Sequence, residues 1–246
     1  MKKLLIPLFL IISIHLAAQD DDGYVMFQTI QLKGHSGHQQ QLREGLKAHN
    51  EKFHTGGSEA VSVWAIRSGP NAAGGISWVK GPLTWTSFDT PLTEDHRDDW
   101  QKNVAAHAEV GEFGYWRLVD GMTYEPEGFK AAVMRIRWFE LKPGKQDDAQ
   151  ETFERIFELF RQENFDRAIH VFSNEAEWGD GRQWALLTQF SSWSSMDQDI
   201  DFTAKYEAIH GVGSWSEFFR DLDEATNWKG TQLNSLIPEL STPDSE

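Results

Sequence analysis

The stretch Trp85-Thr86-Ser87-Phe88-Asp89 recurs 108 residues later as Trp193-Ser194-Ser195-Met196-Asp197. A second landmark, Trp78, has its match in Trp184 at an offset of 106. Features that keep their order and nearly keep their spacing are typical of a tandem duplication. We therefore predict that the chain contains two copies of one structural unit.

Toward the end of each copy the offset falls from 108 to 103. At this smaller offset His107 matches His210, and Trp116-Arg117 matches Phe219-Arg220. The change predicts a five-residue insertion in the first copy, within residues 90–99.

Hydrophobic periodicity and turn residues predict the order β-α-β-β-α-β in each copy. In the first copy we expect strands at 24–32, 60–66, 76–80 and 115–119, and helices at 38–53 and 92–108. In the second copy we expect strands at 132–141, 168–172, 182–188 and 217–222, and helices at 147–161 and 196–210. Such a unit forms a four-stranded antiparallel sheet with both helices on one face.

The chain divides into five predicted segments. Residues 1–19 have the basic start, short apolar run and small residues of a secretory signal peptide, and the run is too short to span a bilayer comfortably. The alternative is a retained membrane anchor. The remaining segments are the first repeat at 24–119, a linker at 120–130, the second repeat at 131–228, and a disordered acidic tail at 229–246. We expect a periplasmic or secreted protein without a stable membrane anchor.

Acidic residues outnumber basic ones, 38 to 23. Removing Lys2 and Lys3 with the signal peptide leaves 21 basic residues and a net charge of −17. Such a surface repels phosphate backbones and anionic headgroups, so nucleic acid and membranes are poor candidate partners. The chain has no Cys, which excludes disulfides, thiolate metal sites and cysteine nucleophiles. The 11 Trp and 16 Phe residues supply a hydrophobic core instead.

The repeated element order and the paired Trp and His landmarks resemble the dimeric α+β barrel superfamily, in tandem form, over residues 24–228. That group includes antibiotic-biosynthesis-type monooxygenases, stress-response barrels, NIPSNAP-like proteins and haem-handling chlorite dismutase relatives. The resemblance implies an α+β fold in which two ferredoxin-like repeats form an intramolecular pseudo-dimeric barrel, as a monomer or a homodimer. It rests on element order, so it carries over no catalytic residue.

The strand expected at 132–141 offers a candidate ligand site between the two sheets. On one of its faces lie three residues that we place in this space: Arg135, Arg137 and Phe139. Buried guanidinium groups need an anionic partner, so we predict that the two arginines contact an anionic or carbonyl-bearing ligand. The alternatives are pairing with acidic residues of the other copy, or access to water.

Trp64 and His170 occupy matching positions in the two hairpins, and we predict that both point into the same space. A histidine in a tryptophan-lined cavity could bind haem iron, act as a base, or only donate a hydrogen bond. The structural role is the commonest one for a single buried histidine.

No metal site is predicted. Four histidines lie close together in the sequence, namely His35, His38, His49 and His54, but no two of them are four residues apart and no carboxylate is placed with them. His96 lies in an acidic segment that only the first copy has, which could form a lid or a cation site. Acidic residues also suit the solvated first turn of a helix.

The sequence has neither a Gly-rich phosphate loop nor a G-x-S-x-G motif, which argues against nucleotide-dependent and serine-hydrolase chemistry. We predict an exported protein that binds a small apolar or anionic molecule in an aromatic cavity, or has a structural role, with no cofactor. One alternative is a monooxygenase-like enzyme, either cofactor-independent or assisted by haem. Another is a carbohydrate-contacting protein that uses its many tryptophans.

Overall fold

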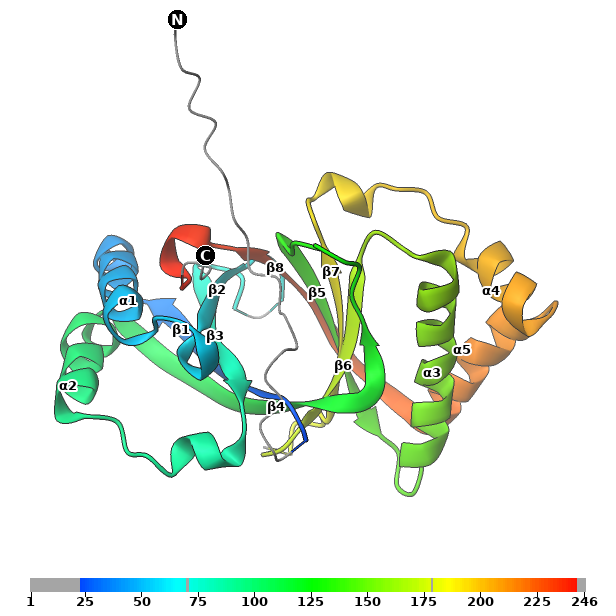
Figure 1. Cartoon of the computed structure of the whole chain (residues 1–246), viewed down its shortest axis with the longest axis horizontal. Helices are drawn as coiled ribbons and strands as arrows, with labels where there is room; N and C mark the ends of the chain where they lie inside the picture. The colour runs from blue at the N-terminus through cyan, green and yellow to red at the C-terminus, as the bar shows by residue number, and fades with distance from the viewer. Residues whose placement is uncertain (1–22, 70, 178, 243–246) are drawn as a thin grey trace, which may run out of the picture.

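The computed structural model describes residues 23–69, 71–177 and 179–242, so the predicted signal peptide at 1–19 lies outside the described residues. Within these ranges the fold is mixed α+β, with eight antiparallel strands closed into a barrel and five α-helices outside it (Figure 1). Across the same ranges no helix has the length and apolar character needed to cross a membrane.

The two halves of the chain have the same order of elements up to their last helices. The elements of the first half are β1 (Met26–Gly34), α1 (Gln39–Phe53), β2 (Val61–Ile66), β3 (Gly75–Leu83), α2 (Glu94–Asn103) and β4 (Ala108–Tyr124). Those of the second half are β5 (Val133–Leu141), α3 (Gln146–Glu163), β6 (Ala168–Asn174), β7 (Trp184–Phe190), α4 (Phe202–His210), α5 (Ser214–Ala225) and β8 (Thr226–Leu236). Most of the predicted helices and strands are therefore confirmed, with shifted ends.

The strands follow one another around the barrel in the order β1-β3-β2-β8-β5-β7-β6-β4. Each half thus contributes four adjacent strands, with its first strand between its third and its fourth. The halves meet at two seams, where Trp64 of β2 pairs with Leu236 of β8 and Trp116 of β4 pairs with Asn174 of β6. A closed barrel leaves no unpaired sheet edge, which stabilises an antiparallel sheet against pairing with other chains.

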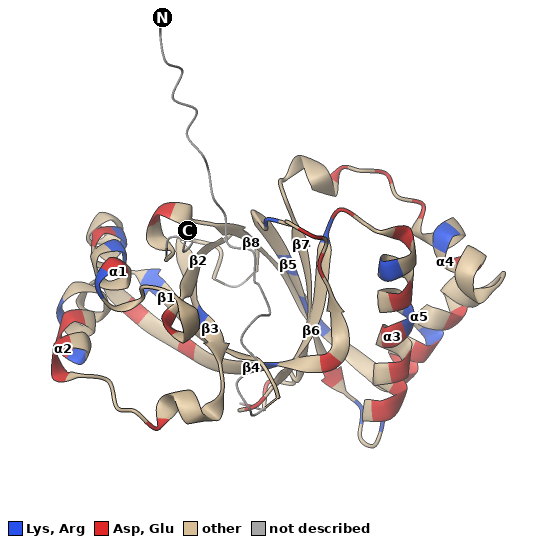
Figure 2. Cartoon of the chain, in the orientation of Figure 1, with Lys and Arg blue, Asp and Glu red and all other residues tan. Residues whose placement is uncertain are grey.

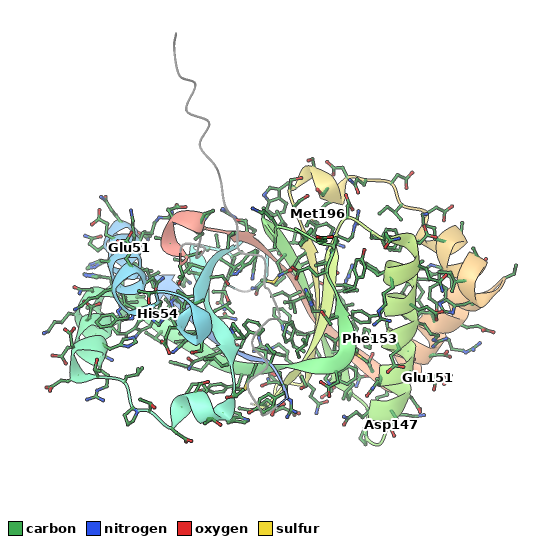
Figure 3. All side chains as sticks on the ribbon, in the orientation of Figure 1. Glu51, His54, Asp147, Glu151, Phe153 and Met196 are labelled. Carbon is green, nitrogen blue, oxygen red and sulfur yellow. The ribbon has the colours of Figure 1, made fainter. Side chains whose placement is uncertain are left out.

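Helices cover the outer face of each half, α1 and α2 on one side and α3 to α5 on the other (Figure 1). Leu46 of α1 packs in one outer core with Trp78 of β3, and Phe153 of α3 packs in the other with Trp184 of β7. Figure 3 shows Phe153 on the side of α3 that faces the strands. Each fully buried apolar side chain contributes roughly 1.5–3 kcal/mol to stability.

Charged residues gather on the outer helices, whereas the strands are mostly uncharged (Figure 2). In α3, for example, Asp147 and Asp148 lie in the first turn, where negative charge interacts favourably with the helix dipole. The acidic surface expected from the composition is thus carried mainly by the helical layers.

The strand predicted at 217–222 is wrong, because these residues lie inside helix α5. Phe218 faces the core while Phe219 is 51% exposed, and apolar residues at 215, 218 and 222 follow helical spacing. The matching of Trp116-Arg117 with Phe219-Arg220 therefore pairs a strand with a helix. Strands β4 and β8 begin 118 positions apart, so the second half carries the extra residues and the five-residue insertion placed in the first half is wrong.

The disordered tail predicted at 229–246 is also wrong over most of its length. Residues up to Leu236 complete β8, which lies between β2 and β5. Beyond it, Ile237 and Leu240 are buried, and residues 243–246 lie outside the described part of the chain. The predicted linker at 120–130 begins inside β4, which continues to Tyr124.

Candidate functional site

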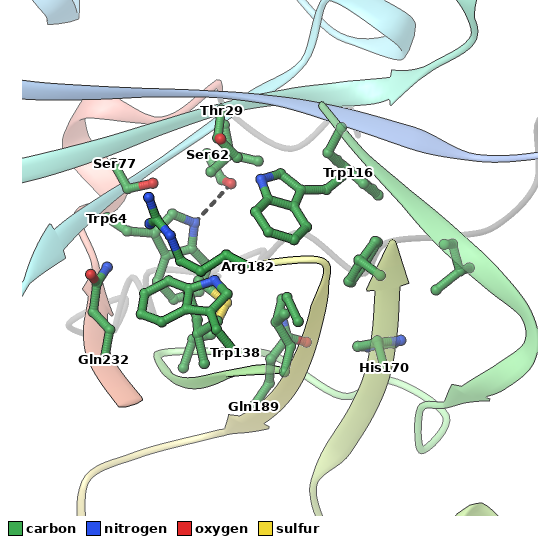
Figure 4. A pocket seen from close by; sticks show the side chains of 18 of the residues that line it. Thr29, Ser62, Trp64, Ser77, Trp116, Trp138, His170, Arg182, Gln189 and Gln232 are labelled. Carbon is green, nitrogen blue, oxygen red and sulfur yellow. Dashed lines mark hydrogen bonds between the residues drawn. The ribbon is translucent and has the colours of Figure 1, made fainter. Parts of the chain in front are cut away.

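A cavity of about 140 Å³ lies inside the barrel, between the strands of the two halves (Figure 4). Three tryptophans form its largest surfaces: Trp64 from β2, Trp116 from β4 and Trp138 from β5. Phe27 and Phe172 also line the cavity and pack edge to face, with their ring centroids 5.7 Å apart. These five aromatic rings, together with aliphatic side chains, make most of the lining apolar, which is the kind of surface that binds small apolar molecules.

Alternation along β5 decides which residues line this cavity. Side chains of neighbouring residues in a strand point to opposite faces, and those that point inward are Met134, Ile136 and Trp138. The prediction that Arg135, Arg137 and Phe139 line the space between the sheets is therefore wrong. Both faces of β5 are buried, the inner one by the opposite strands and the outer one by α3, so hydrophobicity alone did not distinguish them.

The two arginines lie on the helical side of β5. The Arg135 guanidinium is 5.4 Å from the Phe190 ring centroid, and that of Arg167 is 5.3 Å from the same ring. Burial lowers the pKa of Arg135 and of Arg137, and the neighbouring charges of Arg167 and Arg135, respectively, lower them further. Phe139 packs against Phe153 of α3. None of the three predicted residues can contact a molecule held in the barrel cavity from this face.

Trp64 and His170 both line the cavity, as predicted, although their role toward a ligand stays a prediction. The Trp64 Nε1 atom donates a hydrogen bond of 2.9 Å to Ser62 Oγ (Figure 4). The Nδ1 atom of His170 lies 2.8 Å from Thr123 Oγ1, and its Nε2 atom lies 3.8 Å from a carboxylate oxygen of Glu125. Burial lowers the pKa of His170 to about 4, so its ring is neutral at neutral pH.

Arg182 is the charged group that the sequence did not indicate at the cavity. It donates a 2.6 Å hydrogen bond to Glu112, which also lines the cavity, and another to Asp180. Burial opposes its charge, but these hydrogen bonds outweigh burial and raise the pKa of Arg182. Its guanidinium lies 5.4 Å from the Trp138 ring centroid (Figure 4). Arg182 precedes β7 in the hairpin turn, where strand alternation gives no guide to direction.

Haem does not fit this cavity in the structure. An engineered cavity of about 150 Å³ binds molecules as small as benzene, and pockets for drug-sized ligands span roughly 300–1,000 Å³. A porphyrin is far larger than the 140 Å³ present. Of the two ring nitrogens of His170, Nδ1 lies 2.8 Å from Thr123 Oγ1 and Nε2 has no hydrogen-bond partner among the described residues, so the volume of the cavity is what excludes haem.

Three histidines that the sequence did not place together meet outside the barrel. His49, His54 and His96 each offer a ring nitrogen, and these atoms all lie within 4.8 Å of one another. His49 belongs to α1, His54 follows its last turn, and His96 comes from the first turn of α2. No spacing in the sequence could have predicted this cluster, because it depends on how α1 packs against α2.

No protein-family model matches the chain, and no curated protein matches it. Solved structures do match. A proposed monooxygenase from Lactobacillus acidophilus is 12% identical, with 89% of this chain and 96% of that chain covered, at a TM-score of 0.54. A variant of chlorite dismutase from Candidatus Nitrospira defluvii is 9% identical, with coverage of 87% and 92% and a TM-score of 0.55. A haem-binding protein from Thermus thermophilus is 9% identical, with coverage of 88% and 92% and a TM-score of 0.52.

At such low identities these likenesses concern the fold alone. What this chain shares with these structures is the arrangement of its strands and of the helices outside them, over 87–89% of its length. Structural neighbours named as a monooxygenase, a chlorite dismutase and an anthrone oxidase-like protein thus share the mixed α+β fold of this chain.

Proposed function

We propose that the barrel cavity binds a compact, mostly apolar aromatic molecule of one or two rings. The observation that carries this proposal is the wall formed by Trp64, Trp116 and Trp138 around a volume of about 140 Å³. Offset or edge-to-face contact with an aromatic ring contributes about 0.5–1.5 kcal/mol beyond the area buried. A cavity with three such walls therefore favours a flat ring over an aliphatic chain.

The charges around the cavity favour a neutral ligand over an anionic one. Arg182 is already paired with the two carboxylates of Glu112 and Asp180, so it offers little net positive charge. The remaining polar wall is uncharged and includes Gln189 and Gln232, which can donate to or accept from a hydroxyl or carbonyl group. A neutral phenol or aromatic ketone matches this arrangement better than an aromatic acid does.

The second candidate function is oxygenase-like chemistry on such a molecule, and the solved structures named as monooxygenases favour it over binding alone. Oxidation of a ring methylene to a carbonyl consumes one O₂ and releases one water. O₂ is the oxidant, so the reaction needs no bound redox group to balance. His170 supplies a neutral ring nitrogen at the cavity wall that can accept a proton. Its low pKa makes it a weak base, so the substrate must lose a proton easily.

A ligand screen on two variants tests the proposal. Small phenols, indole and naphthols are expected to raise the Tm of the wild type, whereas oligosaccharides, aromatic acids and haem are not. Ala185 lines the cavity, so Ala185→Leu fills part of it and should abolish the shift. Arg135→Lys, on the outer face of β5, is the matched control and should keep it. Stabilisation that survives Ala185→Leu, or a Soret shift on adding haem, would contradict the proposal.

We further infer that the two halves arose by tandem duplication and pack as an intramolecular pseudo-dimer. Corresponding elements of the halves, from β1 and β5 through α2 and α4, begin 107 to 109 positions apart, which supports the inference.

Export through the signal peptide at 1–19 is likewise a proposal, supported by the sequence pattern. Sequencing the N-terminus of exported protein tests it, and recovery of Met1 would contradict it.

A further inference from the structure

The three-histidine cluster lies on the opposite side of β3 from the barrel cavity. Ser77 and Val79 of β3 line the cavity, while Trp78 between them faces outward and lies 5.1 Å from the His54 ring. Figure 3 labels His54 at the end of α1, and Figure 1 shows α1 and α2 side by side over this part of the sheet. The cluster therefore belongs to a second site that the cavity ligand does not reach.

The rings of the cluster form a triangle. Their centroids are separated by 5.3 Å between His49 and His54, 4.9 Å between His49 and His96, and 5.3 Å between His54 and His96. His49 and His54 are fully buried, with 0% and 1% exposure, and His96 is half-buried. The more exposed His96 gives the site a side open toward the surface.

Hydrogen bonds fix which nitrogens face the centre. His54 Nδ1 lies 2.9 Å from the backbone carbonyl oxygen of Glu59. A carbonyl can only accept, so Nδ1 carries the hydrogen and Nε2 keeps a free lone pair. His49 Nδ1 lies 2.7 Å from a carboxylate oxygen of Asp99, which sets the same tautomer. Metal-bound histidines in proteins usually donate their second ring nitrogen to such a carboxylate or carbonyl.

The Nε2 atoms of His49 and His54 have no hydrogen-bond partner among the described residues, although both are buried. Leaving a buried polar atom unsatisfied costs about 1–3 kcal/mol. A purely structural aromatic core would avoid this cost by using Phe at one of these positions, as it does at Phe53, whose ring stacks on His96 at 4.4 Å. A bound cation would satisfy both lone pairs at once.

The surroundings suit a cation held by neutral ligands. Lys80 is paired with Glu59 at 2.7 Å, and Lys52 is paired with Asp95 at 2.8 Å, so both nearby positive charges are compensated. The carboxylate of Asp99 remains as the negative charge beside the cluster.

We propose that His49, His54 and His96 form a binding site for a divalent transition metal, with Zn²⁺ as the ion that matches it best. Three imidazoles with an open fourth position are a known zinc ligand set, and imidazole suits zinc better than it suits Mg²⁺ or Ca²⁺. Ligand atoms of a tetrahedral zinc site lie roughly 3.3 Å apart. The present separations, within 4.8 Å, need only a small closing movement, which the half-buried His96 can supply.

Zinc titration of the metal-stripped full-length chain tests the site. Calorimetry is expected to give one ion per chain, the Tm should rise on saturation, and Co²⁺ should produce the absorption bands of tetrahedral coordination. His96→Gln should weaken Zn²⁺ binding at least tenfold without loss of the fold, because its side chain is not fully buried. Asp99→Asn should weaken binding by about tenfold or more through the orientation of His49.

His38→Gln is the matched control. It removes a different histidine pair, in which His38 Nδ1 lies 3.1 Å from His107 Nδ1, and it should leave Zn²⁺ affinity unchanged. Binding that is equally tight in His96→Gln, or that is lost in His38→Gln, would overturn the proposal by placing the ion elsewhere. Failure of Zn²⁺, Co²⁺, Ni²⁺ and Cu²⁺ to bind the wild type would overturn it outright.

Discussion

Ser77 and Trp78 are neighbours in β3 that face two different sites: Ser77 lines the barrel cavity, and the Trp78 ring lies 5.1 Å from the ring of His54. Trp78 also donates a 3.1 Å hydrogen bond to Asn50 of α1. The strand therefore separates an aromatic cavity from a histidine cluster by the thickness of one backbone. Because the two sites share no side chain, variants of one should leave ligand binding at the other unchanged.

Acid is expected to destabilise the protein through His170. Its pKa is about 4 in the folded protein and 6.5 in the unfolded chain, so the unfolded chain takes up a proton first as the pH falls. The stability that the neutral ring contributes is complete above pH 6.5 and is lost as the pH falls toward 4. Through this one group, the free energy of unfolding changes by up to about 1.4 kcal/mol per pH unit.

Comparing wild type with His170→Gln isolates this contribution. Glutamine can still hydrogen-bond to Thr123, and the nearby Glu125 is present in both proteins. Urea unfolding between pH 4 and pH 8 should show a stability difference that is largest at neutral pH and shrinks on acidification. A difference that is constant across this range would mean that His170 does not change its protonation on unfolding.

Arg182 and Glu112 are expected to stabilise the cavity wall together. Their side chains are 22% and 32% exposed and form a 2.6 Å ion pair, so solvent screens the pair less than a surface pair. A double-mutant cycle with Arg182→Met and Glu112→Gln should give a coupling energy of about 1 kcal/mol. A coupling near zero would mean that Asp180, the other partner of Arg182, takes over the interaction.

The sequence predicts best those elements whose two faces differ in polarity. Helix α3 was predicted closely because its apolar residues follow helical spacing, with Phe153 and Phe157 on one side. The sequence also locates strand β5, but the prediction of which β5 face lines the cavity is wrong. Each face of β5 packs against other parts of the protein. Alternation therefore shows which residues share a face, but not which face points into the barrel.

The end of the chain was predicted poorly for a different reason. Helix α5 contains Trp215, Phe218 and Phe219, and a short window rich in aromatic residues is typical of a strand as well. Strand β8 contains Gly230 and polar residues that suggest a tail, yet it pairs with β5 from Thr226 to Ser235, with one register shift. The histidine cluster lay beyond sequence analysis, because it depends on the packing of α1 against α2.

The segment after β8 is expected to stabilise the barrel seam. Ile237 and Leu240 are buried, and Ser241 and Thr242 accept hydrogen bonds from backbone amides of β2 at 3.0 Å and 2.9 Å. A chain ending at Leu236 should lose roughly 3–6 kcal/mol of unfolding free energy from the two buried side chains alone. The control chain ends at Thr242 and keeps all these contacts. Equal urea midpoints for the two truncated chains would contradict the prediction.

Gly45→Ala is expected to destabilise the protein and weaken metal binding together. Alanine normally favours a helix over glycine by about 1 kcal/mol, which alone would stabilise α1. A Cβ at Gly45, however, would lie 1.7 Å from the carbonyl oxygen of Asn103, the last residue of α2, so α2 must move away and carry His96 with it. Overpacking of this kind costs about 1–3 kcal/mol and outweighs the helix preference.

Gly34→Ala serves as the comparison, because a Cβ there meets its nearest neighbour, Gln39, at an ordinary 3.4 Å. Thermal unfolding should show a lower Tm for Gly45→Ala alone, and zinc titration should show weaker binding for the same variant. If Gly45→Ala raised the Tm, helix preference would outweigh the contact with Asn103. If it lowered the Tm and left zinc affinity unchanged, the position of α2 would not control the geometry of the histidine cluster.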